Sequence, residues 1–249
     1  MSIFFYKNKN TFFHGLDPRI KIICLLLFFL DAIIIKDMTG MIILFLVILI
    51  LFVFSDSLFA LKKILFLFLL IGVTTFILWM IFYKGELTDD IYKKINYAGF
   101  LTLRLLNMLL AGLLFLCITS FEDFSYGLLL FGFPYPVAFT ILLSFKLVDS
   151  FMNSAFLIVE AQKARGNDIT KGNIFKRIKS YAPLLIPLIL TGIKKAQNLV
   201  LALETRGFSP KNKINIDGKY KIKISDIIFL ILFILSSFII FIFYKFKIL

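Results

Sequence analysis

The 249-residue chain is 60% hydrophobic and 17% aromatic, while only 17% of its residues are charged. A soluble domain has roughly 45–50% apolar and about 25% charged residues, so this composition excludes a soluble globular protein. The chain is therefore expected to be an integral membrane protein, and its formal net charge of +13 must be placed relative to the bilayer.

Five apolar stretches predict membrane-spanning helices, because about 20 apolar residues in a helix cross the roughly 30 Å hydrocarbon layer. The predicted fold class is therefore all-α, a polytopic helical membrane protein. The first two stretches are short and predict a helical hairpin around residues 36–39, whereas the last three carry no charge. The five stretches are residues 22–35, 40–54, 64–83, 105–121 and 227–244.

Positive charge is concentrated in residues 160–224, which hold fourteen Lys and Arg against four acids, a net charge of +10. Basic segments stay on the cytoplasmic side, so this segment is predicted to face the cytoplasm. Counting back through four spans places the N-terminus inside and the loop at 84–97 outside. The last span then leaves the C-terminus outside with Lys245 and Lys247, in weak conflict with the rule.

The chain is expected to have three parts: a membrane domain of four transmembrane helices (1–121), a basic cytoplasmic domain of long helices (122–224) and a final transmembrane helix (225–249). An uncharged, Phe-rich stretch at 124–145 follows the first part and is interrupted by Pro134 and Pro136. It could span, re-enter or lie in the interface as the start of a long helix. We favour the last, since a further span would move the basic segment outside.

Two long amphipathic helices are predicted after this junction. From Val137, apolar residues recur at spacings of three and four, and this helix is expected to end at Arg165. Polar residues, including Ser150 and Ser154, fall between the apolar positions. A second helix is expected over residues 182–205, and its apolar face is formed by Leu185, Leu188, Ile189, Gly192, Ile193, Ala196, Leu199, Val200 and Leu203.

Both amphipathic helices end in a small or polar residue, then Arg, then Gly. The two motifs are Ala164-Arg165-Gly166 and Thr205-Arg206-Gly207. Glycine readily takes the left-handed turn that ends a helix, and a guanidinium can pair with a carboxylate through two parallel hydrogen bonds. The motifs are therefore predicted to dock into acidic grooves. The alternative is that each Arg only interacts with the negative end of its own helix, which is worth about 0.3–1 kcal/mol.

The basic segment has other interpretations. It could contact anionic lipid headgroups or bind nucleic acid, although its basic residues are interleaved with apolar helical faces, which disfavours nucleic acid. A stand-alone secondary transporter or a lipid-acting membrane enzyme is a further alternative, and would need polar residues that face one another at mid-membrane depth. The candidates for such residues are Thr74, Thr75, Asn107, Ser236 and Ser237, which more often bond to neighbouring helices.

The N-terminal segment reads as a helix start, with Asp17 at the cap and Pro18 at the first helical position. Arg19 and Lys21 suit an anchor at the inner leaflet. Two ionisable residues, Asp31 and Arg104, lie near span ends where snorkelling is easy, so a proton relay or ion pore is poorly supported.

Three segments carry a family resemblance: Leu16-Asp17-Pro18-Arg19 with Lys21, the sequence EAQKARG at 160–166, and ALETRGF at 202–208. They resemble the transmembrane T component of energy-coupling-factor (ECF) transporters, the EcfT-type, CbiQ-like family, over about residues 13–208. The family's marker is a pair of Ala-Arg-Gly motifs. Here the first is intact, while Thr205 replaces the usual alanine of the second.

The resemblance implies a non-catalytic coupling subunit of an importer for a vitamin or a transition-metal ion, in a prokaryotic cytoplasmic membrane. Two cytosolic ABC-type ATPases, which would bind ATP and Mg, would each receive one of Arg165 and Arg206, and Ala164, Gly166 and Gly207 would permit the fit. A small membrane S component would capture the substrate. The chain itself would then hold no cofactor, metal or catalytic residue.

Overall fold

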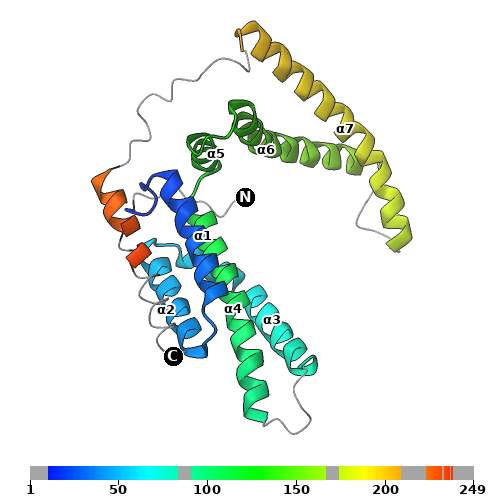
Figure 1. The fold of residues 1–249 in the computed structure, drawn as a ribbon. Coiled ribbons are helices and arrows are strands. Elements are labelled where there is room, and N and C mark those ends of the chain that lie inside the picture. The colour runs from blue at the N-terminus through cyan, green and yellow to red at the C-terminus, as the bar shows by residue number, and fades with distance from the viewer. Residues whose placement is uncertain are drawn as a thin grey trace. The chain divides into compact units, whose positions relative to one another are not determined.

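The computed structural model describes residues 11–83, 91–166, 174–208, 223–231, 233–235 and 237. Every regular element in these ranges is a helix, which confirms the all-α fold class (Figure 1). The chain forms two compact units, one of Met1–Phe131 with Ile216–Leu249 and the other of Gly132–Asn215. Residues 84–90 of the predicted external loop at 84–97 lie outside the described residues, and so do the C-terminal Lys245 and Lys247.

The first two helices form the predicted hairpin in the first unit: α1 is Pro18–Ile34 and α2 is Met38–Phe54. Helix α1 begins where the sequence predicts, because the Asp17 carboxylate accepts a hydrogen bond from the Arg19 N–H at 2.9 Å. Pro18 occupies the first turn, where its missing N–H costs nothing. Each helix has 17 residues, about 26 Å of helix.

The next two helices begin earlier than their apolar stretches. Helix α3 is Leu58–Ile81 and α4 is Ile91–Ile118. The prediction of a loop as far as residue 97 was therefore wrong, because residues 91–97 form the first turns of α4. Apolar content marks only the part of a helix that can lie in hydrocarbon, and charged residues continue the same helix beyond it.

The core of the first unit lies where α1 and α2 pack on α4. Among its members, Met41, Ile48 and Phe52 of α2 are completely buried, and Leu110, Ala111 and Leu114 of α4 face them. Asn107 is buried in the same core, where its amide nitrogen donates to the Met41 carbonyl at 3.0 Å. Asn107 therefore joins two helices, the role that small polar residues usually have inside spans.

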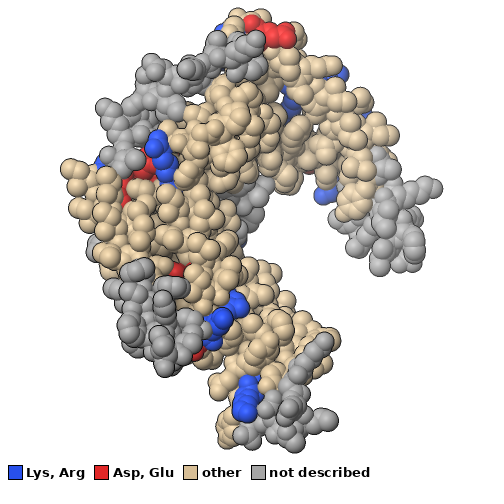
Figure 2. Space-filling view, viewed as in Figure 1, with Lys and Arg blue, Asp and Glu red and all other residues tan. Residues whose placement is uncertain are grey.

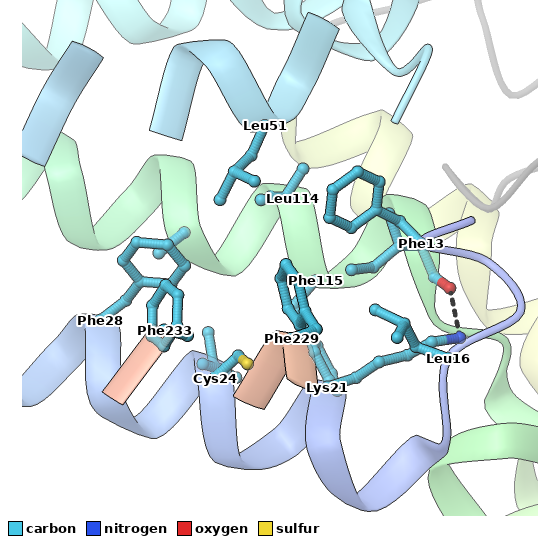
Figure 3. A pocket seen from close by; sticks show the side chains of 13 residues that line it. Phe13, Leu16, Lys21, Cys24, Phe28, Leu51, Leu114, Phe115, Phe229 and Phe233 are labelled. Atoms are coloured by element: carbon cyan, nitrogen blue, oxygen red, sulfur yellow. Dashed lines mark hydrogen bonds between the residues drawn. The ribbon is translucent and has the colours of Figure 1, made fainter. Parts of the chain in front are cut away.

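A final apolar helix, Ile224–Leu235, packs on this core. Its Phe229 and Phe233 rings lie 5.6 Å from Phe13 and 4.7 Å from Phe28 between centroids, and these side chains surround a small apolar pocket (Figure 3). The Ser237 hydroxyl is hydrogen-bonded to the Asp31 carboxylate of α1. The predicted span at 227–244 is thus described only in part, since residues 238–249 lie outside the described ranges.

A short helix, α5 (Phe121–Leu130), precedes the second unit. At 10 residues it is about 15 Å long, too short to cross a bilayer. The Phe-rich stretch at 124–145 is divided after α5, because helix α6 (Tyr135–Ala164) begins only after Pro134. The stretch is therefore not one continuous span, and its second half forms the start of the long helix. Its predicted place in the membrane interface stays a prediction.

The second unit contains the two long helices α6 and α7 (Ile174–Thr205). Helix α7 begins eight residues before the predicted start at 182, so Pro183 lies inside the helix together with Pro187. The prediction that Pro183 lies near the start was wrong, because residues 174–181 carry several lysines and arginines, which interrupt the apolar stretch that marked the helix.

Apolar side chains cover much of the described surface in both units, and few charges interrupt it (Figure 2). Four helical segments among the described residues are long and apolar enough to cross a membrane: α3, α4, α6 and Pro183–Thr205 of α7. Exposed apolar surface of this extent is expected where helices face lipid or other membrane subunits. The chain is a multi-pass membrane protein.

Candidate coupling site

The first Arg-Gly motif ends α6 in the way that the sequence predicts. Ala164 is the last helical residue, Arg165 is the C-cap, and Gly166 has the left-handed φ of +83°. The Gly166 N–H donates to the Lys163 carbonyl at 3.0 Å, which satisfies a backbone acceptor that the helix end would otherwise leave open.

The second motif repeats this geometry at the end of α7. Thr205 is the last helical residue, and Gly207 has φ of +69°. The Gly207 N–H donates to the Glu204 carbonyl at 2.9 Å, and the Phe208 N–H donates to the Leu203 carbonyl at 2.9 Å. These two bonds form a complete Schellman cap, in which only glycine takes the left-handed position without steric cost.

The capped ends leave both arginines free to meet another molecule. Arg165 and Arg206 are exposed, and so are Ala164, Gly166, Thr205 and Gly207. Neither guanidinium forms a hydrogen bond or ion pair with the part of the chain that the structure describes. A Cβ added to either glycine would meet no heavy atom within 4 Å, so open space surrounds both motifs in that part of the chain.

Helices α6 and α7 run antiparallel, so the two motifs do not form one site. Near the middle of the pair, the Lys195 ammonium of α7 contacts Ser150 and Ser154 of α6. Beyond the end of α7, the Phe208 ring stacks on Phe139, close to the start of α6, with centroids 4.7 Å apart. Arg165 and Arg206 therefore lie at opposite ends of the pair, each with its own surroundings.

Comparisons with known proteins identify the family. The model of the CbiQ family, described as cobalt transport proteins, matches residues 9–216. The chain belongs to the CbiQ family. It is 28% identical to the energy-coupling factor transporter transmembrane protein EcfT of Staphylococcus aureus, over 95% of this chain and 94% of that protein. The protein of the same name from Thermosediminibacter oceani is 29% identical, over 81% of this chain and 82% of that protein. The one from Bacillus subtilis is 27% identical, over 82% of this chain and 83% of that protein.

The resemblance to the transmembrane T components of ECF transporters, drawn from the motifs, is thereby confirmed for this CbiQ-family chain. The family match covers both amphipathic helices and both Arg-Gly motifs, since it extends past Gly207 to residue 216. It also includes the N-terminal segment at 16–21.

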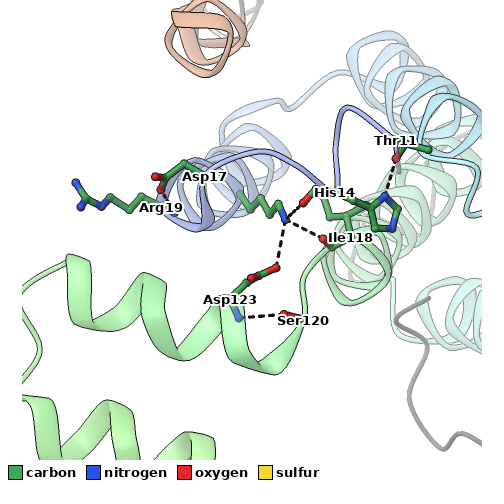
Figure 4. A network of polar contacts seen from close by, with 8 residues as sticks. Thr11, His14, Asp17, Arg19, Ile118, Ser120 and Asp123 are labelled. Carbon is green, nitrogen blue, oxygen red and sulfur yellow. Dashed lines mark hydrogen bonds and ion pairs between the residues drawn. The ribbon is translucent and has the colours of Figure 1, made fainter. Parts of the chain in front are cut away.

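In this CbiQ-family chain, Lys21 links the N-terminal segment to the end of α4. Figure 4 shows the partners His14, Ile118 and Asp123 close to one another. The Lys21 ammonium donates to the carbonyls of His14 at 2.8 Å and Ile118 at 3.0 Å, and lies 3.7 Å from an Asp123 carboxylate oxygen of α5. The prediction that Lys21 anchors the chain to headgroups was wrong, because its side chain is only 1% exposed. Here the ammonium satisfies buried carbonyls.

Arg104 has a similar structural role that the sequence did not predict. Its guanidinium donates to the Ile35 carbonyl at 3.0 Å, just past the end of α1, and its central carbon lies 4.6 Å from the Phe100 ring centroid. A cation at a helix C-terminus satisfies open carbonyls and interacts favourably with the helix dipole. Arg104 and Asp31 therefore both bond to other helices within the first unit.

The sequence did not predict three contacts of the second unit. These are the contacts of Lys195 with Ser150 and with Ser154, and the stacking of Phe208 on Phe139. The one signal available was that Ser150 and Ser154 are four residues apart and so share a helix face. Nothing in the sequence indicates that Lys195 lies opposite that face.

Proposed function

We propose that this chain is the transmembrane coupling subunit of an ECF-type importer, which transmits ATP hydrolysis by two cytosolic ABC-type ATPases to a substrate-capturing membrane subunit. The observation that carries the proposal is the pair of Arg-Gly helix ends. Both have the same glycine cap, both present an exposed arginine without a partner in the described chain, and they lie at opposite ends of one antiparallel pair.

The physical chemistry of the two ends supports docking into acidic grooves. A guanidinium presents a rigid fork of donors that matches a carboxylate, and the absence of a side chain at Gly166 and Gly207 lets a protein surface approach the helix end closely. The alternative, that each arginine only stabilises its own helix, receives no support from hydrogen bonding. The helix-end carbonyls of Lys163, Leu203 and Glu204 are already bonded by backbone N–H groups.

Two separate docking ends suit two ATPase copies better than one. Helix α6 has 30 residues and α7 has 32, so each is about 45 Å long or slightly more. Motifs at opposite ends of such a pair reach two different partner sites. Closure of an ATPase dimer would then displace the two helix ends, and the helices would pass that displacement to the membrane subunit that captures the substrate.

Membrane placement follows from charge. Helices α6 and α7 are apolar enough to cross a bilayer, but residues 160–224 carry a net charge of +10, and we place both helices on the cytoplasmic side. Their exposed apolar side chains would then face the interface and the partner subunits. The substrate, a vitamin or a transition-metal ion, would be chosen by the S component.

Co-purification tests the proposal. The chain would be tagged and co-expressed with a candidate pair of cytosolic ABC-type ATPases from the same organism, then solubilised in detergent. We expect both ATPases to co-purify, and Arg165→Ala or Arg206→Ala each to weaken ATPase binding by at least about 30-fold, since truncating one side of a buried charge pair costs 2–5 kcal/mol or more.

Lys194→Ala is the matched control, because Lys194 is an exposed cation of α7 outside both motifs. It should leave ATPase binding unchanged. A wild-type chain that carries no ATPase would refute the coupling role. Equal effects of Lys194→Ala and the two arginine variants would show that general positive charge, rather than the two motifs, attracts the partner.

A further inference from the structure

The crossing of α6 and α7 is held by a polar clasp around Lys195. Its ammonium donates to the Ser150 hydroxyl at 2.6 Å, the Ser154 hydroxyl at 2.7 Å and the Ser150 carbonyl at 2.8 Å. An ammonium has three donors, and these three oxygens of α6 use all of them. The ring centroid of Phe151 also lies near this nitrogen, at a distance of 6.0 Å.

The helices also approach closely beside the clasp. A Cβ built on Gly192 would lie 3.0 Å from a Phe151 ring carbon, so only glycine fits there without moving the ring. The clasp therefore coincides with a position of close helix packing. Such a point fixes both the crossing and the axial register of the two helices.

Ser154 and Lys195, one clasp residue from each helix, lie the same number of residues before the two coupling motifs. Ser154 precedes Arg165 by 11 residues and Lys195 precedes Arg206 by 11 residues, which is about 16 Å of helix in each case. Because the helices are antiparallel, the two arms extend in opposite directions. A shift at the clasp would change the position of both ends.

The two arms are not held equally. On the Arg206 side, the Phe208 ring contacts the rings of Tyr135 and Phe139, which provides a second attachment to α6. On the Arg165 side, no described side chain of residues 155–166 forms a hydrogen bond, ion pair or ring contact with the described part of α7. Among the described residues, the clasp is therefore the nearest polar fastening of the Arg165 arm to α7.

We propose that Lys195 is a positioning residue that fixes the crossing of α6 and α7 and thereby the separation of the two Arg-Gly ends. The importance of that separation for coupling rests on the proposed function. The clasp itself is a property of this chain alone, so the two can be tested separately.

Spin labels measure the separation directly in the full chain. Cys24→Ala and Cys117→Ala would remove the native thiols, and Lys163→Cys with Glu204→Cys would place labels on exposed positions beside the two motifs. Pulsed electron paramagnetic resonance then gives the distance distribution in detergent or nanodiscs. We expect a narrow distribution for this labelled background, and Lys195→Met should at least double its width.

Matched variants separate the clasp from loss of charge. Lys194→Met removes the neighbouring exposed lysine and should leave the width unchanged, and Lys195→Arg, which keeps the donors, should retain most of the narrow distribution. Replacing Ser150 and Ser154 together with alanine leaves one carbonyl acceptor and should broaden it partially. That double variant decides the question if Lys195→Met does not accumulate. Equal widths for Lys195→Met and Lys194→Met, or no broadening by the double alanine variant, would overturn the inference.

A second measurement connects the clasp to coupling. In the complex with both ATPases, ATP with vanadate should shift the distance between the two labels in the labelled background. Lys195→Met should reduce this shift at least threefold. The amount of ATPase that co-purifies with Lys195→Met should change by less than about twofold. An unchanged shift in Lys195→Met would overturn the positioning role. Absence of ATPases from the wild-type preparation would instead refute the proposed function and leave the distance measurement on the chain alone as the test.

Discussion

Replacing Gly207 with alanine should loosen the C-terminal end of α7 by about 1–2 kcal/mol, because an L-residue in the left-handed region brings its Cβ too close to the following carbonyl oxygen. The φ of Gly207 is +69°. A Cβ there would meet no heavy atom within 4 Å, so no clash with a neighbour adds to the backbone strain. Since 1.4 kcal/mol is tenfold, the closed cap should lose population relative to the open one by roughly 5- to 30-fold.

Hydrogen–deuterium exchange reports this opening at the Phe208 amide, which donates to the Leu203 carbonyl at 2.9 Å in the closed cap. We expect its protection to fall by the same factor in Gly207→Ala, and Gly207→Asn to recover much of it, because Asn tolerates the left-handed region. Gly112→Ala is the matched control: it also has open space around the added Cβ, lies inside α4 and lacks a positive φ.

Gly112→Ala should be neutral or stabilise α4 by about 0.5–1 kcal/mol, since alanine loses less backbone entropy than glycine in a helix. Exchange at Phe208 that stays at the wild-type rate in Gly207→Ala would refute the reasoning from φ. The same refutation would follow if the two alanine variants changed protection in the same direction and by the same factor.

Three further substitutions test contacts of the first unit by thermal denaturation in detergent. Lys21→Met should destabilise the unit by about 3 kcal/mol, because two backbone carbonyls lose a charged donor. The control Lys62→Met changes an exposed lysine and should be close to neutral. Equal losses of stability in the two variants would contradict this account. Ser237→Ala should cost about 1–3 kcal/mol of stability, because the buried Asp31 loses its hydroxyl donor. Proteolysis of the final helix should also accelerate. An unchanged rate of proteolysis would argue that this hydrogen bond does not hold the final helix. Arg104→Met should cost about 1–2 kcal/mol by uncapping α1, and a variant as stable as wild type would show that the cap contributes nothing.

Local signals in the sequence predicted several helix boundaries correctly. Asp17-Pro18 marked the start of α1, and the two Arg-Gly pairs marked the ends of α6 and α7, because capping depends on the φ preference and side chain of one or two residues. Where a helix continued through charged residues, as at the starts of α4 and α7, these residues interrupted the apolar stretch and the predicted boundaries were wrong.

Composition, apolar length and capping are properties of short stretches of chain. The class of protein, its apolar helices and the two motifs that carry the family resemblance could therefore be predicted from sequence alone. The roles of the buried Lys21 and the half-buried Lys195 became apparent only in the folded chain. Lys21 bonds to a carbonyl 97 residues away and Lys195 to serines 41 and 45 residues away, so neither pair could be read from local spacing. Such contacts depend on which helix faces pack together, and that is settled by the combined shape of all the helices rather than by any one segment.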